Sequence, residues 1–271
     1  MLSIPFYQKE WLGVDLLQIA KEISFPSNQV ANYSFYNAFY KELQKNSIFP
    51  NDIWIDNKTF LAKQIQKLLV KYSNVNNLSI LSVGSGFGII ELELKKHGFN
   101  IDLQECQKYS LNHLKDRKDI KIIISNDLSE IKTGSYDMVL AVTSTYCLNI
   151  NSLRQFLVMI SRILKNNGIF IWYETSLTYS YILQYIKIFI YKKLKNKNNG
   201  VLWGWKRSVS VQETNAAISN MFLLEKIYFD NNNNVINPKT LFGVPFNSAV
   251  WQLGIYKNVK PGSSRNTCDK S

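Results

Sequence analysis

The spacing of apolar residues along the chain changes near residue 78. Before this point, apolar side chains recur every three or four positions, as in Phe35–Leu43 and Lys58–Tyr72, which predicts amphipathic helices. After it, short apolar runs alternate with helix-like stretches, the pattern of βαβ units around a parallel sheet. We therefore predict a helical extension or lid over residues 1–77 and an α/β domain over residues 78–257.

Seven strands are expected in the α/β domain, and they are Ser79–Val83, Asn100–Gln104, Lys121–Ile124, Asp137–Val142, Ile169–Tyr173, Leu224–Phe229 and Val250–Tyr256. One helix is predicted from about Gly88 to His97, ended by Gly98 as a C-terminal cap. Another is predicted over Ser152–Leu164, ended by the turn residues 166–168. The expected fold class is α/β, with a doubly wound, mostly parallel, seven-stranded sheet.

The segment after the fifth strand, residues 178–207, is predicted to be a basic, apolar helical insertion. Its stretch Tyr181–Tyr191 is apolar almost all round, and lysines follow it. That length suits a buried or interfacial helix and is too short for a membrane span. Packing on the substrate side of the domain is the favoured alternative, and peripheral contact with a membrane is the other. The polar residues 258–271 are expected to form a disordered tail.

Composition and charge narrow the picture only a little. The chain has 271 residues and is 46% hydrophobic, which suits one large globular α/β domain. The net charge of +12 favours anionic partners without selecting one. Three cysteines without C-x-x-C spacing and two histidines give no pattern for a metal site. With no secretory signal pattern, we expect a cytoplasmic protein, with the inner membrane surface as a further location for the insertion.

A glycine loop follows the first strand of the sheet, at Gly84, Gly86 and Gly88. Glycine lets the backbone turn sharply and approach a ligand closely, and helix amides then face that ligand. Glu105 lies 21 residues after Gly84, at the tip of the second strand, where a carboxylate can accept both hydroxyls of a ribose. The glycine spacing is one residue shorter than the G-x-G-x-x-G of dinucleotide-binding folds.

Residues 78–174 resemble the class I S-adenosylmethionine-dependent methyltransferases, whose motifs occur here in the same order. The similar segments are Leu81–Gly88 with Glu105, Asn126–Leu128, Gly134–Val139 and Arg162–Ile171. One departure is Asn166-Asn167, where the family has Pro-Gly, and it affects the turn and not the ligand. The resemblance implies a Rossmann-like methyltransferase sheet, S-adenosylmethionine as the cofactor and methyltransferase activity.

The resemblance also implies roles for individual residues. The cofactor-binding set would be Gly84, Ser85, Gly86, Gly88, Glu105, Cys106, Asp127, Leu128 and Thr143. In this set the glycine loop would pass the amino acid part of the cofactor, Glu105 would hold the ribose, and Asp127 with Leu128 would meet the adenine. Two members have simpler alternatives, since Cys106 can be a small buried hydrophobe and Asp127 a turn residue.

Methyl transfer needs alignment of the nucleophile and exclusion of water, and a base only when the nucleophile must lose a proton. Tyr146, after the fourth strand, and Glu174, at the end of the fifth, are the candidate catalytic residues. Tyr36 and Tyr40, with Tyr33, are candidates to contact the substrate from the N-terminal helices, although core packing is the commoner use of such a stripe.

The expected acceptor is the oxygen or nitrogen of a small molecule, with a sugar, a phosphorylated intermediate or a secondary metabolite as candidates. Nucleic acid is disfavoured because the sequence has no Asn/Asp-Pro-Pro-Tyr/Phe run to hold a flipped base. Two other functions stay open. One is an RNA methyltransferase that uses the basic segment, and the other is a non-catalytic subunit that binds S-adenosylmethionine.

Overall fold

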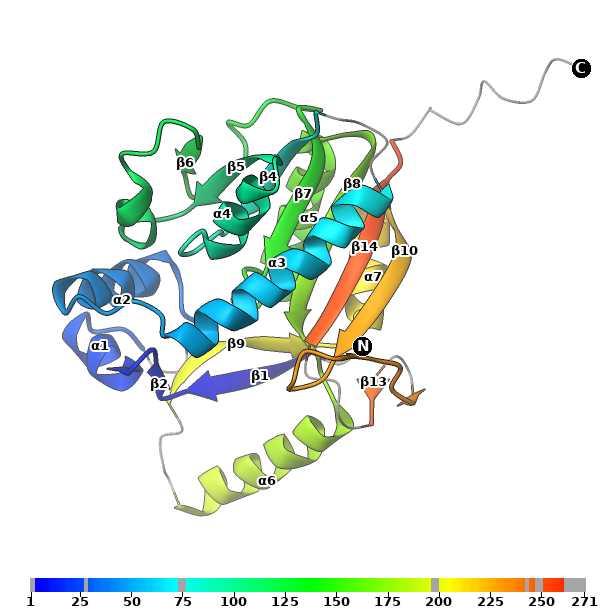
Figure 1. Cartoon of the computed structure of the whole chain (residues 1–271). Coiled ribbons are helices and arrows are strands. Elements are labelled where there is room, and N and C mark those ends of the chain that lie inside the picture. The colour runs from blue at the N-terminus through cyan, green and yellow to red at the C-terminus, as the bar shows by residue number, and fades with distance from the viewer. Residues whose placement is uncertain are drawn as a thin grey trace, which may run out of the picture.

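The computed structural model describes residues 3–26, 29–72, 77–195, 200–241, 244–246 and 251–260, without the side chains of residues 188 and 191–195. An eight-stranded sheet forms the centre of the molecule (Figure 1). Its strands, in spatial order, are β11 (Val235–Ile236), β10 (Met221–Phe229), β14 (Trp251–Asn258), β8 (Leu164–Thr175), β7 (Tyr136–Val142), β4 (Ser79–Val83), β5 (Asn100–Glu105) and β6 (Ile122–Ile124).

The predicted α/β class is confirmed, and each of the seven predicted strands is present within a few residues of its expected bounds. Strands β6, β5, β4, β7 and β8 pair in parallel, and β14 runs antiparallel to both β8 and β10. The short edge strand β11 is additional. One boundary differs from expectation. Helix α5 (Ile150–Ile163) ends directly before β8, so the turn predicted at residues 166–168 lies within that strand, where its pairing with β7 is irregular.

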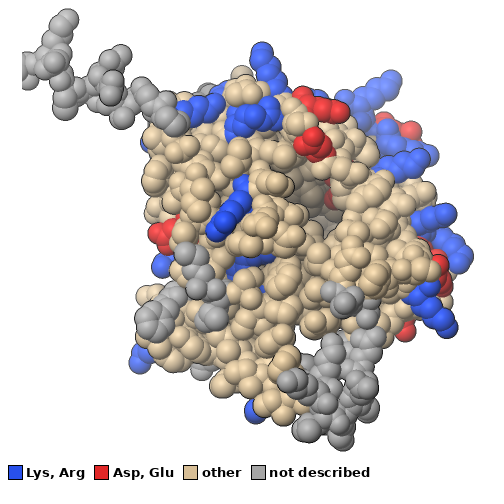
Figure 2. Space-filling model, turned by 180° about the vertical axis from the view of Figure 1, so that it is seen from behind, with Lys and Arg blue, Asp and Glu red and all other residues tan. Residues whose placement is uncertain are grey.

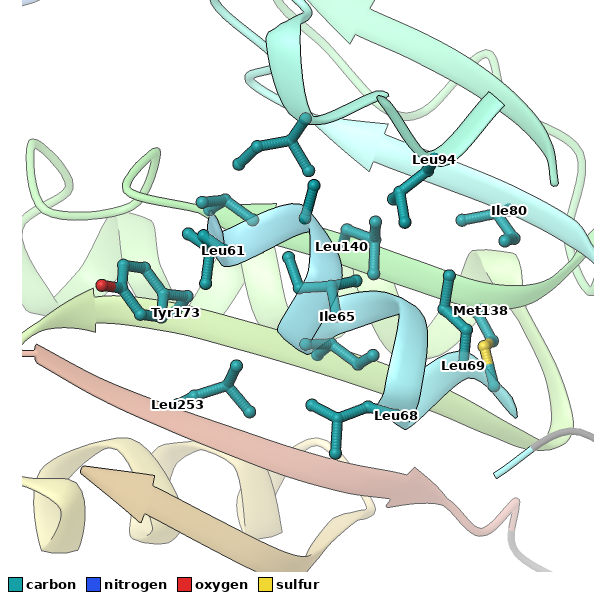
Figure 3. Close-up of a cluster of buried hydrophobic side chains, with 14 of the residues drawn as sticks. Leu61, Ile65, Leu68, Leu69, Ile80, Leu94, Met138, Leu140, Tyr173 and Leu253 are labelled. Carbon is teal, nitrogen blue, oxygen red and sulfur yellow. The ribbon is translucent and has the colours of Figure 1, made fainter. Parts of the chain in front are cut away.

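Helices cover both faces of the sheet. On one face α3 (Asp52–Tyr72) and α4 (Ile89–Lys96) pack over the strands, and on the other lie α5 and α7 (Val209–Ile218). The buried residues Leu61, Ile65, Leu68 and Leu69 of α3 point into the cluster that includes Leu140 and Leu253 from the strands (Figure 3). Helix α3 is therefore part of the central core, although it lies within the predicted extension over residues 1–77.

The rest of the N-terminal region is less helical than predicted. Strand β1 (Ser3–Gln8) pairs antiparallel with β9 (Val201–Arg207), a short hairpin β2 (Glu10–Trp11) and β3 (Val14–Asp15) follows, and then come α1 (Leu16–Glu22) and α2 (Tyr33–Lys45). These elements share a second aromatic-rich core with Phe87 of the glycine loop and Trp203 of β9. We call the unit formed by residues 3–45 and β9 the cap.

The predicted helical insertion over residues 178–207 is half correct. Helix α6 (Tyr179–Lys195) is present, but residues 201–207 are strand β9, because they find their partner at the other end of the chain. Helix α6 lies at the periphery, below the β1–β9 ribbon in Figure 1. Its inner side packs on Ile4 and Leu177, and the small hairpin β12 (Thr240–Leu241) and β13 (Val244–Pro245) lies beside its start. The tail was predicted to begin at residue 258, but Asn258 is buried and ends β14 (Trp251–Asn258); the predicted tail residues from 261 onward lie outside the described residues.

We predict that Ile65→Ala lowers the free energy of unfolding by about 2–5 kcal/mol, since this fully buried side chain sits between α3 and the sheet and its loss leaves a cavity. Val70→Ala on the same helix is the matched control, because Val70 is 63% exposed and its truncation should cost less than about 0.5 kcal/mol. Urea denaturation followed by circular dichroism measures both. Equal losses would show that α3 does not form the core described above.

Candidate active site

A cavity of about 450 Å³ opens at the carboxyl ends of β4, β5 and β7, between the sheet and the cap. Its size is within the range of pockets for small molecules and cofactors. One wall is the glycine loop after β4 with Glu105 at the end of β5, and another is the loop after β7, residues 143–148. The cap and α3 complete it with aromatic side chains, namely Phe6, Trp11, Tyr36, Tyr40, Trp54 and Trp203.

The glycine loop has the left-handed backbone that favours glycine. Gly84 has φ 67°, and a Cβ there would lie 2.5 Å from the Cβ of Ser144, so the two loops approach as closely as their atoms allow. Gly84, Ser85 and Gly86 line the cavity, as expected for a cofactor loop. Gly88 does not line the cavity. It is the N-cap of α4, and a Cβ there would lie 3.0 Å from side-chain carbons of Leu103 in β5 and of Leu114.

Glu105 is 6% exposed and lies directly beside the glycine loop. Its Oε2 accepts a hydrogen bond from the Gly86 amide at 2.8 Å, and its Oε1 accepts one from the Cys106 amide at 2.7 Å. The carboxylate is thus fixed at the tip of β5, where it lines the cavity. Cys106 also lines it, and burial raises the pKa of this thiol well above its ordinary value, so it is neutral near pH 7.

Asp127 and Leu128, expected near an adenine, do not line the described cavity. The Asp127 carboxylate is exposed and accepts hydrogen bonds from the amide and hydroxyl of Ser129, the turn arrangement named above as its alternative. Leu128 is 5% exposed and belongs to the core beneath α5.

The loop after β7 carries two expected site residues into the cavity, Thr143 and Tyr146. Glu174 does not line it, contrary to the expectation of a catalytic role. This buried carboxylate lies behind the loop, where its Oε1 accepts hydrogen bonds from the amide (2.8 Å) and the hydroxyl (2.5 Å) of Thr145. Arg207 of β9 donates to the Thr145 carbonyl at 3.2 Å. Glu174 and Arg207 therefore hold the backbone of the loop that presents Tyr146.

Two of the predicted tyrosines meet across the cavity. The Tyr36 hydroxyl donates to the Tyr146 hydroxyl at 2.9 Å, and the Trp203 ring lies 5.3 Å from the Tyr36 ring and 6.3 Å from the Tyr146 ring. Burial raises the pKa of both tyrosines, which makes them neutral hydrogen-bonding groups and poor bases. The Tyr40 hydroxyl lies over Gly86, 3.5 Å from the position of a Cβ there. Tyr33 is 47% exposed and does not line the cavity.

Two charged residues that the sequence reasoning did not single out also line the cavity, Lys58 of α3 and Glu91 of α4. The Lys58 ammonium lies 3.3 Å from the Thr143 hydroxyl and 5.0 Å above the Trp54 ring, and burial lowers its pKa to about 8. Glu91 is 2% exposed. Their helices are amphipathic and resemble many others, so no pattern in the sequence marks these two positions as facing a ligand cavity.

The comparison with protein families matches residues 81–172 to a model described as a methyltransferase domain. The matched span contains the glycine loop, Glu105 and Tyr146. Residues 81–172, about a third of the chain, therefore form a methyltransferase domain, within a sheet that has the class I methyltransferase fold. The Glu105 carboxylate, fixed at the tip of β5 beside the glycine loop, lies where doubly wound folds place the acid that binds a ribose.

Relatives of the methyltransferase domain are distant. The ubiquinone biosynthesis O-methyltransferase of Rickettsia typhi is 26% identical over 110 residues, which are 39% of this chain and 44% of that protein, so the match spans less than half of its length. Among solved structures, a methyltransferase from Methanosarcina mazei has a TM-score of 0.54 and 10% identity, covering 71% of this chain and 97% of that one. Magnesium protoporphyrin IX methyltransferase from Synechocystis has a TM-score of 0.57 and 9% identity, covering 83% and 97%.

We predict that Gly84→Ala destabilises the methyltransferase domain by more than Gly98→Ala does. Both positions have positive φ, so both substitutions cost roughly 1–2 kcal/mol in backbone strain. Only Gly84 meets another atom, the Ser144 Cβ at 2.5 Å, whereas a Cβ on Gly98 has open space within 4 Å. Thermal unfolding of the two variants compares them directly, and equal shifts would show that the two loops are not in close contact.

Proposed function

We propose that the chain transfers a methyl group from S-adenosylmethionine to an oxygen or nitrogen atom of a small, largely apolar molecule. The observation that carries the proposal is a single cavity that is lined both by a fixed carboxylate, Glu105, beside the glycine loop and by the Tyr36–Tyr146 hydroxyl pair among aromatic rings. The carboxylate with the glycine loop suits a nucleoside, and the hydroxyl pair suits an acceptor.

The proposed cofactor contacts are the backbone of Gly84–Gly86, the Glu105 carboxylate toward the ribose, and Cys106 and Thr143 beside them. The sulfonium of S-adenosylmethionine supplies an already activated methyl group. What remains for the chain is to align the acceptor and to exclude water, and positioning of this kind can supply about 7–11 kcal/mol of the barrier. The cap, which covers the cavity with Tyr36, Tyr40 and Trp203, is the proposed lid.

The proposed acceptor is apolar because rings from β1, α2, α3 and β9 form much of the wall. Its polar atom would hydrogen-bond to the Tyr36–Tyr146 pair. Lys58 is the one Lys or Arg among the described residues that line the cavity, which is little for a phosphorylated acceptor. The basic side chains in Figure 2 are dispersed over that face and do not form one groove, which weighs against the RNA alternative. The name of the Rickettsia relative, an O-methyltransferase, supports oxygen as the acceptor atom.

Cofactor binding tests the donor side of the proposal. We expect calorimetry with S-adenosylmethionine to show one site in the wild type and at least roughly tenfold weaker binding in Glu105→Ala, since a hydrogen-bonded charged group contributes about 1.5–3 kcal/mol. Glu93→Ala is the control, because this glutamate lies on the outer side of α4 and pairs with Lys96 at 2.8 Å. A wild type that binds no S-adenosylmethionine would refute the proposed function.

We also propose that α6 makes peripheral contact with an anionic membrane. Leu183, Ile186 and Ile190 recur at helical spacing and are 60%, 47% and 53% exposed, so they form an apolar stripe that faces solvent. Between Glu174 and Glu213 the sequence has no acidic residue and seven basic ones, among them Lys187 in the same helix. An exposed apolar stripe on a segment rich in basic residues and without acidic ones suits the surface of an anionic bilayer. Within the described residues, no helix has the length and hydrophobicity needed to cross one.

Vesicle flotation tests this contact. We expect the wild type to float with vesicles that contain phosphatidylglycerol and to bind pure phosphatidylcholine vesicles more weakly. The triple variant Leu183→Ser, Ile186→Ser, Ile190→Ser should lose most of this binding. Ile218→Ser is the control, because Ile218 is also 60% exposed but lies at the end of α7. Unchanged flotation of the triple variant would contradict the contact.

A further inference from the structure

The Tyr36–Tyr146 pair has one hydroxyl proton to spare. The Tyr36 hydroxyl donates its proton to the Tyr146 oxygen at 2.9 Å. None of the hydrogen bonds among the described residues has the Tyr146 hydroxyl as its donor. Both side chains are partly exposed, and both line the cavity. The pair therefore offers a hydrogen-bond donor, the Tyr146 O–H group, to a molecule bound in the cavity.

The groups around this pair cannot remove a proton from an acceptor. Burial raises the pKa of Tyr36, Tyr146 and the neighbouring Cys147, so all three keep their protons near pH 7. The Glu174 carboxylate acts on Tyr146 from behind the loop, but it does not line the cavity. Among the described lining residues there is also no histidine and no aspartate.

The charged residues that do line the cavity are engaged elsewhere. Glu105 accepts hydrogen bonds from two backbone amides, and Glu91 accepts one from a buried hydroxyl. The Lys58 ammonium contacts Thr143 and the Trp54 ring, and its pKa of about 8 leaves it mostly protonated at pH 7. A nucleophile at the tyrosine pair must therefore arrive with its lone pair already free.

We propose that the acceptor is an apolar molecule whose reacting atom is an oxygen that is already anionic when it binds, as in a carboxylate or an ionised acidic phenol. This inference rests on the proposed function and narrows its acceptor from oxygen or nitrogen to anionic oxygen. Such an oxygen has several lone pairs, so it can accept the Tyr146 proton in a hydrogen bond and still attack. A neutral amine has one lone pair, which the same hydrogen bond would occupy, and a neutral alcohol would need a base.

The transfer then balances without a proton. A lone pair of the acceptor oxygen forms the new O–CH₃ bond while the C–S bond of the donor breaks, and the electron pair of that bond stays on sulfur. The products are a neutral ester or ether and a neutral thioether. Attraction between the anionic oxygen and the sulfonium is stronger in a cavity walled by aromatic rings than in water, which favours this pairing of substrates.

The test uses probes with one ring system and different head groups. 2-Naphthoate is a carboxylate, 2-naphthylmethanol an alcohol and 2-naphthylmethylamine an amine. Calorimetry in the presence of S-adenosylhomocysteine measures their binding, and mass spectrometry after incubation with S-adenosylmethionine measures methylation. We expect 2-naphthoate to bind roughly tenfold or more tightly than the alcohol and to be methylated, since a hydrogen bond to a charged group is the stronger one. The alcohol and the amine should stay unmethylated.

2-Naphthol distinguishes the two sources of an anionic oxygen. Methylation whose rate rises with pH as this phenol ionises supports the proposal and extends it to phenolates. Absence of methylation, with 2-naphthoate methylated, supports the proposal for carboxylates alone.

Tyr146→Phe removes the donated proton and keeps the ring. We expect it to weaken 2-naphthoate binding roughly 10- to 100-fold and 2-naphthylmethanol binding only about threefold or less. Tyr33→Phe is the matched control, because Tyr33 is 47% exposed and does not line the cavity, and it should leave both affinities unchanged. Equal weakening of both probes in Tyr146→Phe is the behaviour of a purely structural role and overturns the proposal.

Two further results contradict the proposed acceptor class alone. One is a wild type that methylates the alcohol or the amine in preference to 2-naphthoate. The other is a wild type that binds S-adenosylhomocysteine and none of the probes. A wild type that binds neither S-adenosylmethionine nor S-adenosylhomocysteine instead refutes the proposed function, and the acceptor class with it.

Discussion

Parallel pairing of β4 with β5 on one side and β7 on the other is the constraint on which the rest of the site depends. The pairing sets Val83 against both Gln104 and Ala141, so three strands end at one edge of the sheet. The chain leaves each strand there into a loop that cannot continue the ladder. The glycine loop, Glu105 and residues 143–148 are therefore neighbours because of the register, although they are far apart in the sequence.

Loop positions are then fixed by contacts that the register alone does not supply. The close approach of Gly84 to Ser144 sets the distance between the glycine loop and the loop after β7. From behind, Glu174 and Arg207 hold the backbone at Thr145, and the Trp205 amide of β9 donates to the Tyr146 carbonyl at 2.9 Å. The loop that presents Tyr146 is thus fixed by the sheet on one side and by the cap on the other. A buried carboxylate with such a role is easily mistaken for a catalytic one in the sequence alone.

The sequence predicted the parts of the molecule that local spacing encodes. Short apolar runs give the strands, and the interval from Gly84 to Glu105 gives the β4–α4–β5 unit with its acid. It did not predict the β1–β9 pair, because the two strands are about 200 residues apart in the sequence and no short turn joins them. Nor did it identify Lys58 and Glu91, whose positions depend on how α3 and α4 are rotated over the sheet. Gly88, in contrast, belongs to the predicted motif, but the structure places it against core side chains and not in the cavity.

The β1–β9 ribbon lies between the cavity and α6. On one side it contributes Phe6 and Trp203 to the cavity wall. On the other it supports α6, whose Tyr181 hydroxyl donates to the Pro5 carbonyl at 3.2 Å and whose Tyr181 ring lies 4.3 Å from the Lys206 ammonium. A bilayer docked on α6 would therefore be separated from the acceptor end of the cavity by a single two-stranded ribbon.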